Sequence, residues 1–293
     1  MADFIGIDIG ATNIRVGTID EDENISFIHK ELTFNNVKSS EDLYQKISNL
    51  IKLVPNYEMA KAIGIGVPGA IDKSIGKVLS CNKNIEILKD ILFVERLNND
   101  FNKPVFIEND ARVAALAEAL KGRGKNKNIV CFITISTGLG GGLVCNKKIY
   151  SGSNNLGAYF ARMILDGKNT SDNLISGRAL LKQAKEKISD KIDNLSKLFE
   201  LEKSNITANE IIENFKENLN VLLLNISSTI NPDIIIIGGG VTKSKEYFLE
   251  DVKKRFKEKC HLFAKETIID IAEFEEPGVL GSALLAKSGY NKQ

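Results

Sequence analysis

Two glycine-rich turns, one in each half of the chain, constrain most strongly what this sequence can fold into. The first lies within Phe4-Ile-Gly-Ile-Asp-Ile-Gly-Ala-Thr-Asn-Ile-Arg-Val-Gly17, and the second within Cys131-Phe-Ile-Thr-Ile-Ser-Thr-Gly-Leu-Gly-Gly-Gly-Leu-Val144. In both segments an apolar strand pattern enters the turn and another strand pattern leaves it. Glycine lets neighbouring backbone N–H groups point together at an anion, because no Cβ stands in the way. Two such hairpins predict a polyphosphate clamped between two lobes.

The same turns exclude two commoner glycine motifs. The sequence contains no G-x-x-x-x-G-K-[ST] segment, which excludes a P-loop. Gly138 and Gly140 begin a G-x-G-x-x-G pattern, but Leu143 occupies its last position. A strand pattern then follows, where a dinucleotide fold requires a helix. Each turn taken alone is compatible with an ordinary tight hairpin, and it is the pair that favours phosphate binding.

Composition is that of an ordinary globular protein. The 293 residues are 43% hydrophobic and 26% charged, and the net charge is +1. That balance gives no electrostatic footprint for nucleic acid or acidic lipid. No apolar run approaches the roughly 20 residues that span a bilayer. The strand pattern that begins at Asp3 leaves no room for a signal peptide. We therefore expect a cytoplasmic protein with neither a nucleic-acid nor a membrane partner.

Cysteine and histidine usage argues against structural zinc. The four cysteines lie far apart, no C-x-x-C segment occurs, and His29 and His261 are the only histidines. A tetrahedral site needs four such ligands brought together, so we predict no zinc. We interpret the cysteines as small buried hydrophobic residues in a reducing compartment.

Strand and helix patterns alternate along the chain, which predicts an α/β fold with mixed sheets. Expected strands cover residues 3–9, 13–20, 25–33, 61–67, 104–107 and 233–238. Expected helices begin near Ser39 and at Ala111, cover about 171–186, 207–230 and 243–259, and end the chain from Pro277. Residues 151–170 read as irregular, and 185–217 as a solvated helical surface.

A polar linker at 122–128 marks the expected boundary between lobes. We expect a smaller N-terminal lobe of residues 1–120, completed by the C-terminal helix at about 278–293. The larger lobe then covers residues 121–277.

Polar residues beside the turns carry the candidate chemistry. Asp8 ends a buried strand immediately before the first turn, where a carboxylate can hold Mg²⁺ against phosphate oxygens or can merely cap the turn. Gly10 and Thr12 supply donors to phosphate, and Thr137 and Gly138 do the same in the second half. Gly238-Gly239-Gly240 leaves a bare strand end that a flat adenine or ribose can approach, although glycine there also serves close packing.

Glu108-Asn109-Asp110 lies between a buried strand and a helix start. Asn109 offers both a donor and an acceptor to carbohydrate hydroxyls. Asp110 could accept a hydroxyl proton as that oxygen attacks a γ-phosphate. The alternative is that these residues only cap the helix.

Five motifs in order make the chain resemble the ROK family of bacterial sugar kinases and related repressors. The motifs are Asp8-Ile-Gly-Ala-Thr12, Gly66-Val-Pro-Gly69, Glu108-Asn-Asp-Ala111, Ser136-Thr-Gly-Leu-Gly-Gly-Gly142 and Gly238-Gly-Gly240. The resemblance covers nearly the whole chain. It implies an actin-like, hexokinase-like (ribonuclease H-like) duplicated α/β fold with two lobes and a cleft between them, and it suggests a homodimer.

The resemblance also implies cofactors and roles for individual residues. It implies ATP and Mg²⁺, a sugar bound in the cleft and Asp110 as the catalytic base, and the Mg²⁺ agrees with the metal role that the position of Asp8 suggests. ATP would be bound by the two turns and the glycine triplet, through Gly10, Ala11, Thr12, Asn13, Thr137, Gly138, Gly239 and Gly240. The sugar would be bound by Pro68, Gly69, Asn109 and Asp110, and by Asn84, for which Asn82 is an alternative.

The sugar loop departs from the family pattern. Members usually carry G-E-x-G-H after the second hairpin, and Tyr159 and Arg162 stand here in place of the Glu and the His. The zinc-binding cysteine cluster is absent, and Asp172 matches the glutamate that closes that motif. The chain therefore resembles the zinc-lacking N-acetylmannosamine kinases of the family, which act in amino-sugar (sialic acid) catabolism. Tyr159 and Arg162 could enclose an N-acetyl group, or they could only fill space left by the metal loop.

The sequence thus favours ATP-dependent phosphorylation of N-acetylmannosamine at the 6-hydroxyl. The first alternative is a glucokinase or another hexose kinase of the family. A sugar-sensing repressor would need a helix-turn-helix before the first hairpin, where the strand pattern already begins. A sugar-binding pseudokinase or regulator is suggested by the lost Glu and His, but intact Asp8, Asn109 and Asp110 count against it.

Overall fold

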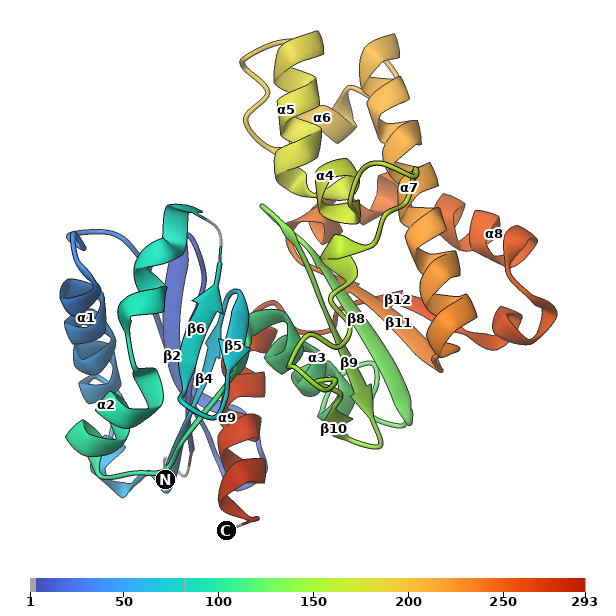
Figure 1. Ribbon diagram of the computed structural model, residues 1–293. Helices are drawn as coiled ribbons and strands as arrows, with labels where there is room; N and C mark the ends of the chain where they lie inside the picture. Colours follow the sequence, from blue (N-terminus) through green and yellow to red (C-terminus); the bar gives the residue numbers. More distant parts are fainter. Residues whose placement is uncertain (1–3, 82, 293) are drawn as a thin grey trace. The chain divides into compact units, whose positions relative to one another are not determined.

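The computed structural model describes residues 4–81 and 83–292, which form two compact units (Figure 1). The first unit contains the chain up to Gly122, the segment Lys147–Gly157 and the stretch from Phe274 onward. The second unit contains Arg123–Asn146 and Ala158–Glu273. These units differ from the division expected at residues 120 and 278 mainly because residues 147–157 pack with the first unit.

The first unit is built on a five-stranded sheet in the order β3-β2-β1-β4-β7. Its strands are β1 (Phe4–Ile9), β2 (Asn13–Ile19), β3 (Ile25–Leu32), β4 (Ala62–Val67) and β7 (Val105–Asn109). β1 pairs antiparallel with β2 and parallel with β4, and β4 pairs parallel with β7. Parallel strands end at the same edge of a sheet, so the residues that follow β1, β4 and β7 share one edge, the usual place for a ligand in an α/β sheet.

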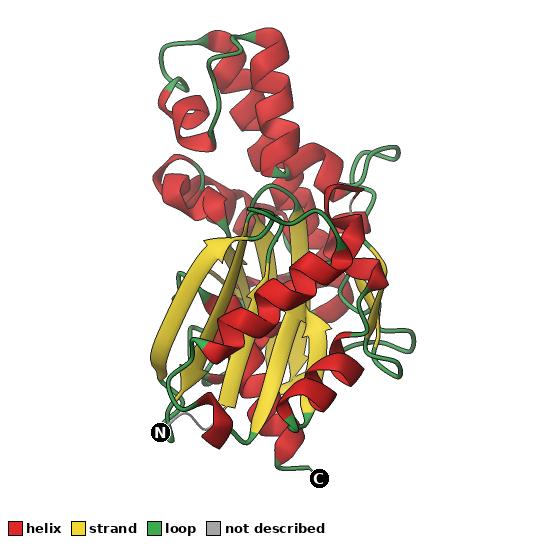
Figure 2. Cartoon of the chain, turned by 90° about the vertical axis from the view of Figure 1, so that its left-hand side faces the viewer, coloured by secondary structure: helices red, strands yellow, loops and turns green. Residues whose placement is uncertain are grey.

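Helices cover both faces of this sheet (Figures 1 and 2). On one face, α1 (Ser40–Lys52) and α2 (Phe93–Phe101) bury Tyr44 and Leu97 in one hydrophobic core. On the other face, α3 (Asp110–Leu120) and α9 (Pro277–Tyr290) bury Leu116 and Leu284 in a separate core. The predicted helix start near Ser39 is confirmed, because the Ser39 hydroxyl accepts the Asp42 N–H in a capping box.

Short elements complete the first unit. They are η1 (Tyr57–Met59), the hairpin strands β5 (Ala70–Asp72) and β6 (Lys77–Ser80), η2 (Lys83–Asp90) and β10 (Lys148–Ile149). The strand expected from residue 3 begins at Phe4 in the structure, and residue 3 itself lies outside the described residues.

The second unit repeats the strand order of the first. Its strands β8 (Ile129–Ile135), β9 (Leu139–Cys145), β11 (Ile234–Gly238) and β12 (Ile268–Ile271) follow the order β9-β8-β11-β12. β8 and β9 are antiparallel, and β8, β11 and β12 are parallel, as β1, β4 and β7 are in the first unit. Each unit therefore has a glycine-turn hairpin followed by parallel strands, as the two sequence hairpins predicted.

The helices of the second unit are α4 (Ser171–Ile175), α5 (Gly177–Lys187), α6 (Leu195–Glu200), α7 (Ile206–Ile230) and α8 (Leu249–Lys259), with 3-10 turns η3 (Phe160–Arg162), η4 (Gly240–Tyr247) and η5 (Leu262–Glu266). The single helix expected over 171–186 is broken at Ser176, whose backbone is extended and whose hydroxyl accepts the Ala179 N–H. That capping bond offers the backbone an alternative to continuing the helix.

The prediction of a solvated helical surface over 185–217 is wrong. Leu198, Phe199, Ile211 and Phe215 are buried in the core of the second unit. Phe199 and Phe215 pack edge to face, with ring centroids 5.8 Å apart. The polar composition of the segment conceals one apolar face on each helix. Among the described residues, no helix combines the length and the apolar character needed to cross a membrane.

The backbone of helix α9 packs closely against the backbones of α3 and of strand β4. A Cβ added to Gly281 would lie 1.7 Å from the Val113 carbonyl oxygen, and one added to Gly64 would lie 1.8 Å from the Ser282 carbonyl oxygen. Both neighbours are backbone atoms, which cannot rotate away. The packing that supports β1, β4 and β7 therefore requires glycine at both positions.

We predict that Gly281→Ala destabilises the protein. Alanine raises helix propensity by up to about 1 kcal/mol over glycine, but a clash with backbone typically costs about 1–3 kcal/mol and should outweigh that gain. Urea unfolding measures the change. Gly240→Ala is the control, because a Cβ there meets no heavy atom within 4 Å. Equal unfolding midpoints for Gly281→Ala and the unchanged protein would contradict the close crossing.

Candidate functional site

The first glycine turn connects β1 to β2 and is braced from the end of β3. The Gly10 N–H donates to the Asn13 carbonyl oxygen at 2.8 Å, which closes the turn. The buried Thr33 hydroxyl donates to the Gly10 carbonyl oxygen at 2.7 Å, and the Thr33 N–H donates to the Thr12 carbonyl oxygen at 3.0 Å. Ala11 and Thr12 are exposed, and within residues 4–81 and 83–292 nothing accepts their N–H groups. The turn therefore presents donors to an external anion, and Thr33 is a support that sequence reasoning missed.

Asp8 ends β1 and belongs to an ionic chain. The Arg15 guanidinium lies 3.2 Å from the Asp8 carboxylate and pairs on its other side with Glu276, which Lys30 also contacts at 3.3 Å. A Cβ on Gly278 would lie 2.5 Å from the Asp8 carboxyl carbon, so this glycine gives the carboxylate its room. Asp8 is thus held by a cation beside the first turn.

Burial raises the pKa of Asp8 to about 7. The Arg15 charge lowers it, but loss of water is the larger effect, and the Asp110 carboxylate raises the pKa further. An added cation would favour the ionised form. A carboxylate next to a phosphate-binding turn is also the ligand type that Mg²⁺ prefers. The residues at this position therefore fit a magnesium ion.

Asn109 caps the helix that carries the candidate base. Its side-chain oxygen accepts the N–H groups of Ala111 at 3.1 Å and Arg112 at 3.3 Å, which uses both lone pairs. Its side-chain nitrogen donates to the Gly69 carbonyl oxygen at 3.1 Å. The cap that the sequence left as an alternative is therefore present, and Asn109 has no acceptor left to offer a ligand.

Asp110 follows Asn109 at the start of α3. Burial raises the pKa of Asp110, while hydrogen bonds from the Ala111 N–H and the Asn109 side chain work in the opposite direction. Within the described ranges, no lysine, arginine or histidine pairs with it. A carboxylate that lacks a cation and has a raised pKa is better suited to accept a proton than an ordinary aspartate.

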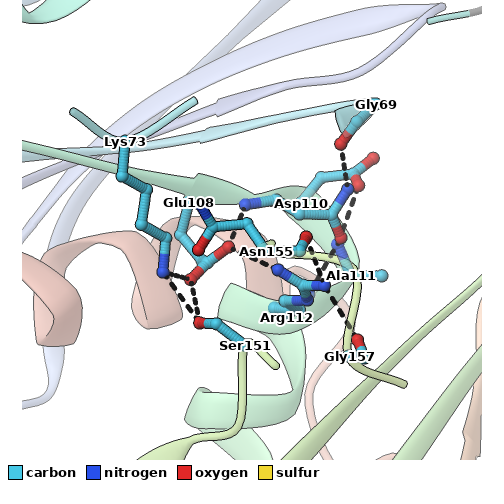
Figure 3. A network of polar contacts seen from close by, with 10 residues as sticks. Gly69, Lys73, Glu108, Asp110, Ala111, Arg112, Ser151, Asn155 and Gly157 are labelled. Carbon is cyan, nitrogen blue, oxygen red and sulfur yellow. Dashed lines mark hydrogen bonds and ion pairs between the residues drawn. The ribbon is translucent and has the colours of Figure 1, made fainter. Parts of the chain in front are cut away.

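A buried charge cluster supports this turn (Figure 3). Glu108, only 1% exposed, pairs with Arg112 at 3.2 Å and with Lys73 from the β5–β6 turn. Its Oε1 also accepts the Asn109 N–H at 2.8 Å. The Ser151 hydroxyl accepts a bond from Lys73 at 2.9 Å. Glu108, two residues before the candidate base, is therefore the centre of a network.

Sequence reasoning named Glu108 only within its motif and missed Lys73, Arg112 and Ser151. One signal was present: Arg112 interrupts an alanine-rich, otherwise apolar helix start four residues after Glu108, and a pair at that spacing meets on one helix face. Lys73 and Ser151 left no local signal.

The structure brings Pro68 and Gly69 to the same edge as Asn109. β4 ends at Val67, which lies opposite Asn109 in the sheet register. Gly69 has φ +107°, and a Cβ there would lie 2.2 Å from the Ser80 carbonyl oxygen. The backbone of Asn84 belongs to η2, but its side chain and all of Asn82 lie outside the described residues.

In the second unit, Thr137 and Gly138 form the β8–β9 turn. Thr137 is exposed, and the Arg178 N–H at the start of α5 donates to its carbonyl oxygen at 3.0 Å. The Asp172 carboxylate accepts the Leu139 N–H at 2.8 Å and pairs with the Arg178 side chain at 2.7 Å. Both Asp172 oxygens are engaged here, which favours support of the turn over a direct sugar contact.

Gly239 and Gly240 are joined to the same turn by Ser136. The Gly240 N–H donates to the Ser136 hydroxyl at 3.0 Å. Gly239 has φ +86°, and a Cβ there would lie 2.6 Å from the Ser136 Oγ and the Ile135 carbonyl oxygen. The four predicted nucleotide residues of the second half thus form one surface of the second unit.

Tyr159 immediately precedes η3 of the second unit, and Arg162 is the last residue of η3. Tyr159 is 42% exposed and Arg162 is also exposed. In the described part of the chain, neither side chain has a hydrogen-bond or ionic partner. Both are therefore available to a ligand. No group of three or more histidine, cysteine or acidic side chains among the described residues is arranged to hold a metal ion.

Comparison with known proteins identifies relatives of both the fold and the sequence. The ROK family model matches residues 4–289. The xylose repressor of Bacillus spizizenii is 30% identical over 263 residues, covering 85% of this chain and 67% of the repressor.

Two solved structures show the likeness in three dimensions. A ROK family glucokinase from Streptomyces griseus, in complex with glucose and AMPPNP, superimposes with a TM-score of 0.81 at 24% identity, covering 98% of this chain and 99% of that one. A proposed N-acetylmannosamine kinase from Listeria monocytogenes has a TM-score of 0.86 at 22% identity, covering 99% of both chains. The predicted actin-like, hexokinase-like duplicated α/β fold is confirmed.

We predict that Asp8→Asn stabilises the nucleotide-free protein at pH 8. Asp8 has a pKa of about 7 in the folded protein and 3.8 as its ordinary value. The folded state therefore holds the proton that the unfolded state loses, and the free energy of unfolding falls as pH rises from about 4 to 7. The neutral amide removes this penalty, which is on the order of a few kcal/mol.

Urea unfolding at pH 4.5, 6 and 8 measures the effect. The advantage of Asp8→Asn should grow through this range. A difference that does not change with pH would show that Asp8 ionises in the folded protein as it does in water.

Proposed function

The chain belongs to the ROK family, and we propose that it is an ATP-dependent sugar kinase that phosphorylates N-acetylmannosamine at its 6-hydroxyl. The observation that carries the proposal is Asp110, an acid with a raised pKa and no cation partner among the described residues. It shares the carboxyl edge of one sheet with Asp8 and the first glycine turn. A general base, a metal ligand and a phosphate cradle are the parts that phosphoryl transfer needs.

In this reaction Asp110 accepts the proton of the 6-hydroxyl as that oxygen attacks the γ-phosphorus of ATP. A bond forms between the sugar oxygen and phosphorus, and the bond from the γ-phosphorus to the β,γ-bridging oxygen breaks. ADP leaves with the electron pair of that bond, and the sugar leaves as its 6-phosphate. The raised pKa of Asp110 suits this step, because it makes the carboxylate a stronger base than an ordinary aspartate.

We propose that Mg²⁺ accompanies ATP and that no zinc is used. Asp8 would hold the ion, directly or through water, and the bound ion would neutralise charge on the phosphate oxygens. Arg15 holds the Asp8 carboxylate until then. Atomic absorption on active protein tests the zinc half of this proposal, since one tightly held zinc per chain would contradict it.

Nucleotide binding is assigned to backbone groups. In the first unit, Gly10, Ala11, Thr12 and Asn13 form the turn, in which the exposed Ala11 and Thr12 have N–H groups that no described residue accepts. In the second unit, Thr137 and Gly138 offer a second set, and Gly239 and Gly240 leave a surface free of side chains. The AMPPNP complex of the Streptomyces griseus glucokinase supports ATP as the phosphate donor.

The choice of N-acetylmannosamine rests on Tyr159 and Arg162. Both are exposed and stand where the family pattern has a Glu and a His. A guanidinium and a phenol can donate to an acetyl oxygen, whereas the usual pair recognises hydroxyls. The Listeria monocytogenes structure supports this choice, and the glucokinase makes glucose the second candidate.

The remaining sugar contacts are assigned to the first unit. Pro68, Gly69, Asn109 and Asp110 share one edge of the sheet, and Asn84 is assigned by its sequence match alone. We also propose a cytoplasmic homodimer without nucleic-acid or membrane partners. A regulator without turnover is the other class of function, because one relative is a xylose repressor.

A coupled ADP-release assay tests the proposed function. Purified protein with Mg·ATP is offered N-acetylmannosamine, N-acetylglucosamine, glucose, mannose and fructose in turn. We expect the highest kcat/KM with N-acetylmannosamine. Turnover of glucose alone would overturn the substrate and keep the kinase, whereas sugar binding without ADP release would support a regulator.

Replacement of the base should separate chemistry from binding. We predict that Asp110→Asn lowers kcat by about 10²-fold or more, because the amide cannot accept the proton. ATP affinity should change little, since both glycine turns are intact. Asp193→Asn is the control, because it makes the same change at an exposed acid of the second unit and should leave kcat unchanged. If Asp110→Asn keeps nearly full kcat, Asp110 is not the base and serves only at the start of the helix.

Replacement of the two loop residues tests sugar selection. We predict that Tyr159→Ala and Arg162→Ala each lower kcat/KM for N-acetylmannosamine by about 2- to 13-fold, which corresponds to about 0.5–1.5 kcal/mol per lost hydrogen bond, and leave ATP binding unchanged. The ratio to kcat/KM for mannose, which lacks the acetyl group, is the informative quantity. If that ratio stays constant in both variants, the residues only fill space.

A further inference from the structure

The segment Ser151–Gly157 forms a closed loop on the first unit. The Gly157 N–H donates to the Ser151 carbonyl oxygen at 2.8 Å, which joins the two ends. Gly152 has φ +69°, and a Cβ there would lie 3.0 Å from the Gly157 nitrogen. The loop ends two residues before Tyr159 in the sequence.

Arg112 holds the C-terminal half of this loop. Its Nη2 donates to the Asn155 and Gly157 carbonyl oxygens, both at 2.8 Å, while its Nη1 lies 3.2 Å from Glu108 (Figure 3). The guanidinium is about 5% exposed. Its planar fork can bind a carboxylate and two carbonyls together, which lysine cannot reproduce.

Lys73 holds the other end of the loop. Its ammonium donates to the Ser151 hydroxyl and pairs with Glu108, so two cations from different elements converge on one buried carboxylate. Glu108 in turn accepts the Asn109 N–H. A single carboxylate thus connects the Ser151–Gly157 loop to the turn that presents Asp110.

Stability alone gives little reason for this arrangement. A buried ion pair loses hydration that its attraction roughly offsets, and a neutral pair of similar size is often equally stable. The charged groups instead fix an arrangement. Their hydrogen bonds have defined directions, so they allow only one position of the Ser151–Gly157 loop relative to the Asp110 turn.

We propose that the Glu108–Arg112 pair is a positioning device of the sugar site, which fixes the Ser151–Gly157 loop relative to the Asp110 turn. The inference rests on the proposed sugar kinase function. Arg112 touches no reacting atom and acts through the two carbonyls and Glu108. A sugar then meets a preformed surface, and the free energy of ordering the loop is not taken from binding.

The test compares Arg112→Met with the double variant Glu108→Gln/Arg112→Met. The single variant leaves a buried carboxylate without its guanidinium and should lower the melting temperature. The double variant removes both charges of the pair but keeps an oxygen at position 108 for the Asn109 N–H. The Lys73 side chain is 36% exposed and keeps the Ser151 hydroxyl and water as partners, so the melting temperature should return toward that of the unchanged protein. This variant separates loss of position from loss of stability.

Two measurements on the double variant decide the proposal. Hydrogen exchange of the peptide 151–157 should be about tenfold faster or more, because the loop loses its two anchoring bonds. The KM for the sugar should rise about tenfold while the KM for ATP stays within about twofold. A double variant with normal exchange in 151–157, or one whose sugar KM recovers along with its melting temperature, would overturn the proposal.

Controls separate this inference from the proposed function. Lys216→Met removes an equally buried cation of the second unit, paired with Glu202 and Glu213, and should lower stability without changing the sugar KM. If the unchanged protein turns over no sugar, the proposed function fails, and calorimetric titration with N-acetylmannosamine replaces KM. Exchange in 151–157 needs no activity and is read in either case.

Discussion

Partial or complete loss of water around three acids at one edge of a sheet is the constraint on which the candidate site depends: Glu108 is buried, and Asp8 and Asp110 are half-buried. Asp8 follows β1, while Glu108 and Asp110 lie at the end of β7 and the start of α3. Two of them receive guanidinium partners, Arg15 for Asp8 and Arg112 for Glu108. Asp110 receives only N–H donors from described residues, and burial raises its pKa. The unequal distribution of cations distinguishes the proposed base from the proposed metal ligand and from the acid at the centre of the buried network, although all three are carboxylates.

Duplication supplies the same turn twice, but each unit supports it differently. The first turn is held by Thr33, which follows β3. Its neutral hydroxyl donates to the Gly10 carbonyl oxygen and brings no charge to the turn. The second is held by the Asp172–Arg178 pair and by Ser136. The second turn therefore carries a carboxylate close to the donors that would face phosphate, and the Arg178 charge offsets its repulsion. The strand order is common to the two units, whereas the chemistry around each turn is specific to it.

Sequence reasoning predicted the parts that local patterns encode. The hairpins, the buried strand at β4, the Ser39 cap and the helix after Asp110 all follow from residues close together in the chain. The core helices between residues 185 and 217 were misread, because each buries only a few apolar side chains within a polar composition. The contact between Arg112 and the Ser151–Gly157 loop could not be predicted from the sequence for another reason. Arg112 binds carbonyl groups 43 and 45 positions away, and a carbonyl acceptor places no demand on the side chain that bears it.

The cap at Asn109 has a consequence for how a substrate hydroxyl would be recognised. Both lone pairs of its side-chain oxygen are used by the N–H groups of α3, so Asn109 cannot accept from a ligand. The Asp110 carboxylate is then the acceptor that this turn presents. In the proposed reaction, a hydroxyl that binds here would donate its proton to Asp110, so the contact that recognises the hydroxyl would also be the contact that removes the proton. Binding in this position and alignment for proton transfer would therefore need the same geometry. The buried Glu108 cluster supports that geometry, because Glu108 accepts the Asn109 N–H in the turn that presents Asp110.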